Sequence, residues 1–241
     1  MTKIIAALLT MLVIISCENE NESKYKSETT PIDTAITDSL LIGQIASFPF
    51  ENDISDHSGN AFPLAFSGLI HFKAANKTSF SLFKEMNDYV QFILPASDTL
   101  SFTCFLKSEK KVNANGSKIL DLNKKAEVGF YADAVTGPTY MAIGTSVKNN
   151  LINSYNSWIF LYVEIIKNSG TAKMIIKNIE SSDLQTFEYL ISLTEPISAG
   201  ELIRIGANFS LQNGFSGAID ELKLFNRSLS ESELEYLYKN Q

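Results

Sequence analysis

The stretch that decides the fold reads IRIGANFSLQNGFSGAIDELKLFNRSLSESELEYLY over residues 203–238. Its first part has short apolar runs separated by Gly, Asn and Ser, which is typical of strands joined by turns. Ser230 and Glu233 then have the spacing of a helix N-terminal capping box. The apolar positions that follow repeat at i, i+3 and i+4, at Leu234, Leu237 and Tyr238. We predict a strand that leads into a short terminal helix.

The same strand-like pattern extends back to about residue 44. LSFTCFL (100–106) alternates, with Phe102, Cys104 and Leu106 on one side. WIFLYVEII (158–166) and KMIIKNI (173–179) are rich in β-branched and aromatic residues. Many short strands without βαβ alternation predict an antiparallel sandwich or barrel.

Four stretches resemble, in order, the laminin G-like branch of the concanavalin A-like lectin/glucanase superfamily. They are NDISDHSGNAFPLAFSG (52–68), NDYVQF (87–92), LSFTCFLK (100–107) and the closing stretch 203–238. The resemblance implies an all-β jelly-roll β-sandwich of two antiparallel sheets with a short C-terminal helix. Two positions depart from the family pattern: Phe105 replaces a usual Trp, and Trp158 lacks the histidines that often follow it. We expect Trp158 to lie in the core.

The sequence argues against catalysis. Glucanases of this superfamily use an E-x-D-x-x-E strand, in which alternation puts paired carboxylates on one face, and the chain has none. Asp220 and Glu221 are adjacent, so on a regular strand they point to opposite faces. The only histidines are His57 and His71, and no G-x-S-x-G elbow is present. We expect a protein that is not an enzyme, with a divergent glycoside hydrolase or polysaccharide lyase as the alternative.

The resemblance also implies a structural Ca²⁺ between the opening loop and the closing strand, where oxygen ligands would suit it. The candidate ligands are Asp56, Asp220, Asn60 and Asp53. The alternative is that the loop carboxylates form Asx turns and that Asp220 accepts hydrogen bonds from nearby backbone amides.

Glycan binding needs aromatic faces and hydrogen-bonding side chains on a sheet or loop rim. The aromatic candidates are Tyr131, Tyr140, Tyr155, Phe209 and Phe215. Packing in the core is the alternative role for each of them.

The N-terminus predicts export. Residues 1–16 have one lysine, a short apolar run and a terminal serine, which is typical of a signal peptide. Ile14-Ile15-Ser16-Cys17 resembles the bacterial lipobox, which implies cleavage before Cys17 and lipidation of its sulfur. We therefore divide the chain into a signal peptide (1–16), the lipidated Cys17 with a flexible tether (17–43), and a domain (44–241).

The composition narrows the partners. The chain has 20 Lys and Arg against 27 Asp and Glu, with a net charge of −7, which excludes a basic nucleic-acid-binding face. Cys104 has no partner if Cys17 is acylated, so we expect a buried thiol. Together these features predict an outer-membrane lipoprotein, held on the membrane through its lipid alone, that binds glycan or polysaccharide. Exposure on the cell surface is one of the two orientations open to it. A protein–protein adhesion domain is a further alternative.

Overall fold

The computed structural model describes residues 31–51, 53–61, 63, 65–67, 71–75, 78–83, 88–93, 96–108, 117–123, 126–132, 139–143, 157–166, 169–179, 186–192, 198, 200–207, 209–210 and 214–240. The predicted signal peptide, Cys17 and Tyr155 lie outside these residues.

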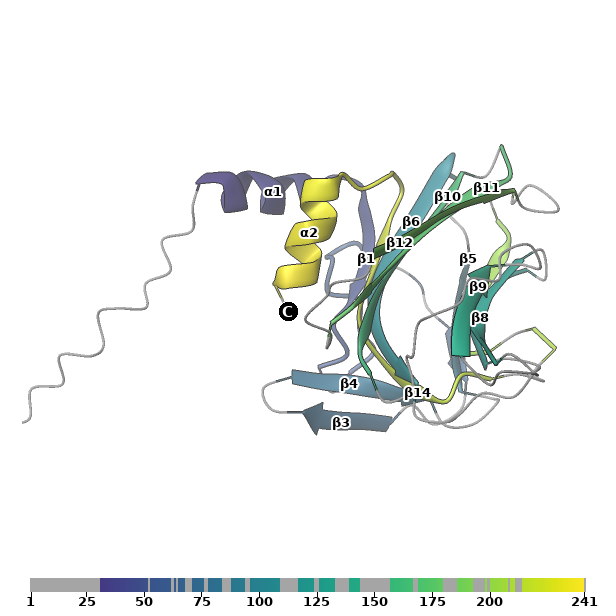
Figure 1. The fold of residues 1–241 in the computed structure, drawn as a ribbon. Coiled ribbons are helices and arrows are strands. Elements are labelled where there is room, and N and C mark those ends of the chain that lie inside the picture. The colour runs from purple at the N-terminus through teal and green to yellow at the C-terminus, as the bar shows by residue number, and fades with distance from the viewer. Residues whose placement is uncertain are drawn as a thin grey trace, which may run out of the picture.

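The described strands form two sheets, and every pair of named strands is antiparallel (Figure 1). Sheet A has the order β12 (Thr186–Ser192), β11 (Thr171–Asn178), β10 (Ile159–Ile166), β6 (Thr99–Ser108), β14 (Gly217–Phe225), β4 (Thr78–Phe83) and β3 (His71–Ala75), and β1 (Gln44–Phe48) also pairs with β14. Sheet B has the order β2 (Ala65–Ser67), β5 (Tyr89–Ile93), β13 (Leu202–Ile205), β7 (Ser117–Leu122), β8 (Ala126–Ala132) and β9 (Thr139–Ile143). The predicted sandwich of two antiparallel sheets is confirmed.

The main core fills the space between the sheets. Strand β6 contributes every second side chain to it, with Phe102, Cys104 and Leu106 all buried as the alternation predicted. Strands β5, β13, β7 and β8 of sheet B contribute their alternate apolar residues in the same way. Cys104 is a buried free thiol, and burial, with a smaller effect of the Asp220 charge, raises its pKa above the ordinary range.

A second apolar cluster lies on the opposite face of sheet A, under helix α2 (Glu231–Lys239) (Figure 1). Leu234 and Leu237 pack there against Phe105, Phe160 and other outward side chains of the sheet. The capping box is present, since the Ser230 hydroxyl accepts from the Glu233 N–H and the Glu233 carboxylate accepts from the Ser230 N–H. The predicted terminal helix is therefore confirmed.

Trp158 belongs to this outer cluster. It is half-buried and packs against Ala218 and the residues beneath α2, not between the sheets. The expectation that it lies in the main core is wrong, because it stands one position before β10 and its neighbour Ile159 takes the inward place.

The segment expected to be a flexible tether is partly helical. Helix α1 (Pro31–Leu41) packs on α2, with Ile36 and Leu40 in the apolar cluster. The helix was not predicted from the sequence because the segment contains several Thr and Asp residues. Pro31 nevertheless stands at the first helical position, where proline is favoured. Helix α1 thus packs on the domain ahead of residue 44, and the division of the chain at 43/44 stays a prediction.

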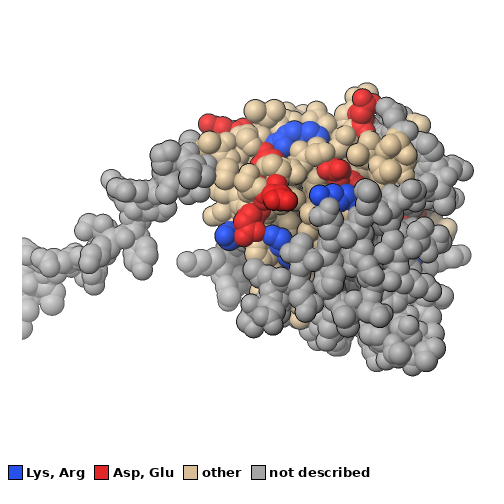
Figure 2. Space-filling model, turned by 45° about the horizontal axis from the view of Figure 1, so that its top comes forward, with Lys and Arg blue, Asp and Glu red and all other residues tan. Residues whose placement is uncertain are grey.

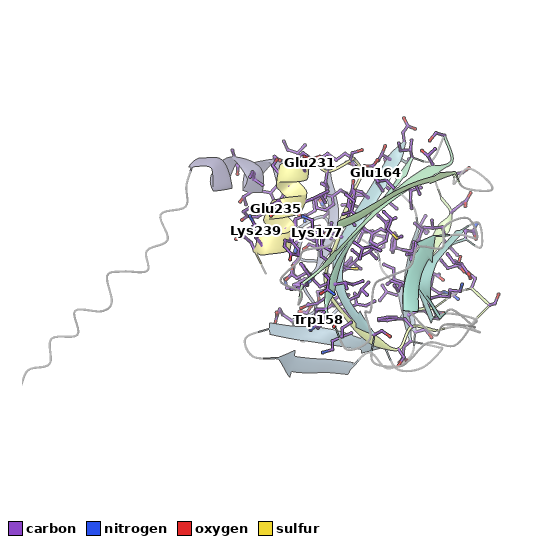
Figure 3. The ribbon with its side chains drawn as sticks, in the orientation of Figure 1. Trp158, Glu164, Lys177, Glu231, Glu235 and Lys239 are labelled. Carbon is purple, nitrogen blue, oxygen red and sulfur yellow. The ribbon has the colours of Figure 1, made fainter. Side chains whose placement is uncertain are left out.

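The outer side of α2 is charged. Figure 3 shows Glu231, Glu235 and Lys239 along the helix, with Lys177 of β11 beside it. The Glu235 carboxylate lies 2.6 Å from Lys177 Nζ and 3.0 Å from Lys239 Nζ. Acidic and basic side chains are interspersed over the described part of this face (Figure 2). Among the described helices, none combines the length and apolar character needed to cross a membrane.

Candidate functional site

A row of polar residues crosses the outer face of sheet B. Gln91 on β5 is in register with Arg204 on β13, Arg204 with Asp121 on β7, and Asp121 with Glu127 on β8. Their sequence neighbours on both sides are mostly core residues, so alternation directs these four side chains away from the core. We call Gln91, Arg204, Asp121 and Glu127 the polar row.

Arg204 is the centre of the polar row. Its guanidinium carbon lies 3.9 Å from the ring centroid of Tyr89 and 4.3 Å from that of Phe209. Its Nη2 donates to the Gln91 Oε1 at 2.9 Å. Stacking on aromatic rings and hydrogen bonding in one plane suit the flat guanidinium group, so Arg204 fixes the positions of both rings and of the amide.

The segment that follows β13 folds back over the row. The Phe209 N–H donates to the Asp121 Oδ2 at 2.8 Å, and the Phe209 ring covers Arg204. Asp121 is consequently only 1% exposed and Arg204 only 8% exposed, although both are on the outer face. Tyr89, Gln91, Glu127 and Phe209 remain half-exposed. The face therefore presents two rings, an amide and a carboxylate, supported by buried charges.

The two carboxylates of the row do not form an accessible catalytic pair. Asp121 and Glu127 are opposite each other on neighbouring strands. Asp121 is buried beneath the Phe209 segment, and the Glu127 Oε2 is 2.7 Å from the Nζ of buried Lys118. Asp121 is thus enclosed, and Glu127 is held in an ion pair while part of its carboxylate reaches solvent.

The predicted aromatic residues have different places. Tyr131 and Tyr140 are register partners on β8 and β9, at the edge of sheet B. Phe209 lies beside the polar row. Phe215 is 1% exposed in the core between the sheets, so its ring is unavailable to a ligand and its assignment as a contact was wrong. Tyr155 is outside the described residues.

The predicted loop ligands of Ca²⁺ shape the opening loop. Asp56 Oδ1 accepts from the N–H groups of Ser47 and Ser58, and its Oδ2 accepts from the Ser58 hydroxyl. Asp53 accepts from the Ser55 N–H. The Asn60 amide donates to the backbone carbonyls of Gln44 and Ile45 on β1. These contacts fit the Asx-turn alternative, and they hold the loop on the edge of β1.

Asp220 stands on β14, where its Oδ1 accepts from the Glu221 N–H at 2.9 Å, as the backbone-amide alternative predicts. Strand β14 pairs with β4 through residues 217–219 and with β1 through residues 222–225, and Asp220 and Glu221 lie at the junction, where the register shifts. Burial raises the pKa of Asp220 to about 7; the Glu221 N–H and Lys223 oppose the shift, while the Glu221 and Glu51 carboxylates add to it.

The four predicted ligands are thus not assembled in one cluster. Within the described part of the chain, His, Cys, Asp and Glu side chains do not gather in groups of three or more that could hold a metal ion. These four side chains therefore do not form the shared oxygen site that the resemblance implies. Ca²⁺ binding stays a prediction.

Sequence reasoning missed most of the polar row and its support. The signal was present in each strand, since Gln91 interrupts Val90 and Phe92, and Arg204 interrupts Ile203 and Ile205. A polar residue in the middle of an apolar strand marks its outer face. What the sequence lacks is the order of the strands, which places these residues side by side.

No protein-family model matches the chain, and no curated protein matches it by sequence. Solved structures do share its fold. Domain 4 of AbnA, an extracellular arabinanase from Geobacillus stearothermophilus in complex with arabinotriose, is 18% identical with a TM-score of 0.59, over 81% of this chain and 98% of that chain. The receptor binding domain of botulinum neurotoxin D is 14% identical with a TM-score of 0.57, over 84% of this chain and 54% of that chain. The chain thus spans about half the length of the neurotoxin structure. At these identities the likeness establishes the β-sandwich fold.

Proposed function

We propose that this protein is a lipid-anchored module of the bacterial cell envelope that binds glycan on the outer face of sheet B. The observation that carries the proposal is the polar row with its two rings. Half-exposed aromatic faces beside amide and carboxylate groups are the elements that bind sugar rings and hydroxyls. The fold shared with a domain bound to arabinotriose supports the same class of ligand.

Glycan binding is tested by titration calorimetry and affinity gels with arabino-oligosaccharides and a wide polysaccharide panel. Phe209→Ala removes one of the two rings and is expected to weaken binding at least about tenfold, since an aromatic face buries much of a bound ring. Tyr236→Ala is the matched control, because Tyr236 is a half-exposed aromatic on α2, across sheet A from the row. An unaltered affinity of Phe209→Ala, with native circular dichroism, would place the site elsewhere.

Catalysis is checked in the same samples. A reducing-end assay on each polysaccharide is expected to show no turnover, because both carboxylates of the row make internal contacts. Turnover that Glu127→Gln abolishes would favour a hydrolase. Capture of an envelope protein without any glycan binding would favour an adhesion domain.

The anchor is a separate part of the proposal. A lipobox-like segment at residues 14–17 supports it. Mass spectrometry of the mature N-terminus is expected to find acylated Cys17, and Cys17→Ala is expected to move the protein from the membrane to the soluble fraction. Membrane retention of Cys17→Ala would exclude anchoring through this cysteine.

A further inference from the structure

The arginine of the site is not available to an anion. Arginines that bind carboxylate or sulfate groups present two N–H groups side by side to the ligand. The Arg204 guanidinium carbon lies 3.9 Å and 4.3 Å from the ring centroids of Tyr89 and Phe209, one nitrogen donates to Gln91, and only 8% of the residue is exposed. An anionic ligand would have to open this stack to reach the guanidinium group.

The side chain of Lys118, the lysine next to the polar row, is also largely enclosed. Lys118 Nζ is 2.7 Å from Glu127 Oε2, and the exposed fraction is 7% for the lysine side chain and 29% for the glutamate side chain. The part of this ion pair that reaches solvent is therefore mainly the carboxylate. Among the described residues of the row and its support, the charges that a ligand meets are negative.

Resting on the proposed function, we infer that the polar row selects neutral glycans and excludes glycans that carry carboxylate or sulfate groups. A neutral sugar packs its C–H face on Tyr89 or Phe209 and donates hydroxyl hydrogen bonds to Gln91 and Glu127. An acidic sugar would place its charge near Glu127, while Arg204 and Lys118, the described cations of this face, are already enclosed. The net charge of −7 adds repulsion at longer range.

The test compares matched polymers in titration calorimetry: laminarin with alginate, unsulfated with sulfated galactan, and arabino-oligosaccharides with oligogalacturonates. Each is measured with the mature protein at low and at high NaCl. The neutral member of a pair is expected to bind at least about tenfold more tightly, and salt is expected to change its affinity less than about twofold, because no exposed ion pair forms.

Tighter binding of the acidic member, weakened by salt, would overturn this inference and leave glycan binding intact. Absence of binding to every polymer would overturn the proposed function and the inference together.

A pair of variants separates local from long-range charge. Glu127→Gln removes the negative charge from the face, so the ratio of neutral to acidic affinity is expected to fall at least about threefold. Glu231→Gln changes the net charge equally, but Glu231 is exposed on α2 across sheet A from the row, and we expect no change. Equal effects of both variants would contradict selection by the polar row.

Discussion

Arg227 and Glu233 form a bidentate ion pair that joins both ends of the described chain. Arg227 Nη2 lies 2.7 Å from Glu233 Oε1, and Nη1 lies 3.0 Å from Oε2. The same guanidinium group donates to the backbone carbonyls of Ser39 and Ile42, at the end of α1. One arginine thus connects α1, the end of β14 and α2.

Glu233→Gln is expected to destabilise the protein by about 2–3 kcal/mol at neutral pH, because it removes the charge of a buried carboxylate that pairs with the half-buried Arg227. Burial alone would raise the pKa of Glu233, but hydrogen bonds from Arg227, Ser39 and Ser230 outweigh it and lower the pKa to about 2. A depressed carboxyl pKa stabilises the folded state above the unfolded value of 4.5, and this contribution is lost as pH falls toward 2. Urea unfolding from pH 7 to pH 3 measures the difference, which is expected to narrow below about pH 5.

Glu235→Gln provides the control on the same helix. Its pairs with Lys177 and Lys239 are more exposed, so a loss below about 1 kcal/mol is expected. Equal losses of stability for Glu233→Gln and Glu235→Gln would show that the Arg227–Glu233 pair stabilises the protein no more than the exposed pairs of Glu235 do.

Gly217→Ala is expected to cost roughly 3 kcal/mol or more, or to prevent folding, because overpacking against backbone has no easy relief. A Cβ at this position would lie 2.1 Å from the carbonyl oxygen of Lys107 on the neighbouring strand. Gly59 has a φ of +83° and open space around the added carbon, so Gly59→Ala is expected to cost only about 1 kcal/mol. Thermal unfolding compares the two, and a tolerated Gly217→Ala would contradict the close approach of β14 and β6.

Arg204→Lys is expected to destabilise the fold by about 1–3 kcal/mol, because an ammonium group cannot stack between two rings and keep the same hydrogen bond. Tyr89→Phe retains the ring of the stack and is expected to change stability by less than about 0.5 kcal/mol. Denaturant unfolding measures both. An Arg204→Lys variant with unchanged stability would indicate that the stacking of Arg204 on the two rings does not support the face.

Calcium binding is tested by melting the protein in Ca²⁺ and in chelator. If the predicted ion binds at the β14 junction, Ca²⁺ is expected to raise the melting temperature and Asp220→Asn to abolish the difference. Asp56→Asn is expected to lower stability by about 1–3 kcal/mol in both solutions, because the Asp56 carboxylate accepts loop hydrogen bonds. Equal melting in both solutions, with no heat of Ca²⁺ uptake, would exclude the ion.

Much of the fold could be predicted because its signals are local. Alternation in β6 and the capping box at Ser230 depend on neighbours within a few residues, and both are confirmed. Helix α1 was missed because its stability comes from the packing of its residues Ile36 and Leu40 against α2, which is far away in the sequence, and not from its own composition.

The candidate site was harder to predict because it depends on strand order. Gln91 and Arg204 are far apart in the sequence and adjacent in sheet B, and no local pattern encodes that pairing. The exposure of Phe209 and the burial of Phe215 also follow from where the chain turns back over the sheet, so residue type alone could not separate them.

The position of β14 has a consequence for the order of folding. Residues 217–225 fill the place between β6 on one side and β4 and β1 on the other, and Phe225 also supports α2. Until this late stretch has been synthesised, sheet A remains in three parts, which are β12-β11-β10-β6, β4-β3 and β1, and contacts of long sequence separation are missing. A growing chain therefore completes sheet A only after its C-terminal region has emerged from the ribosome.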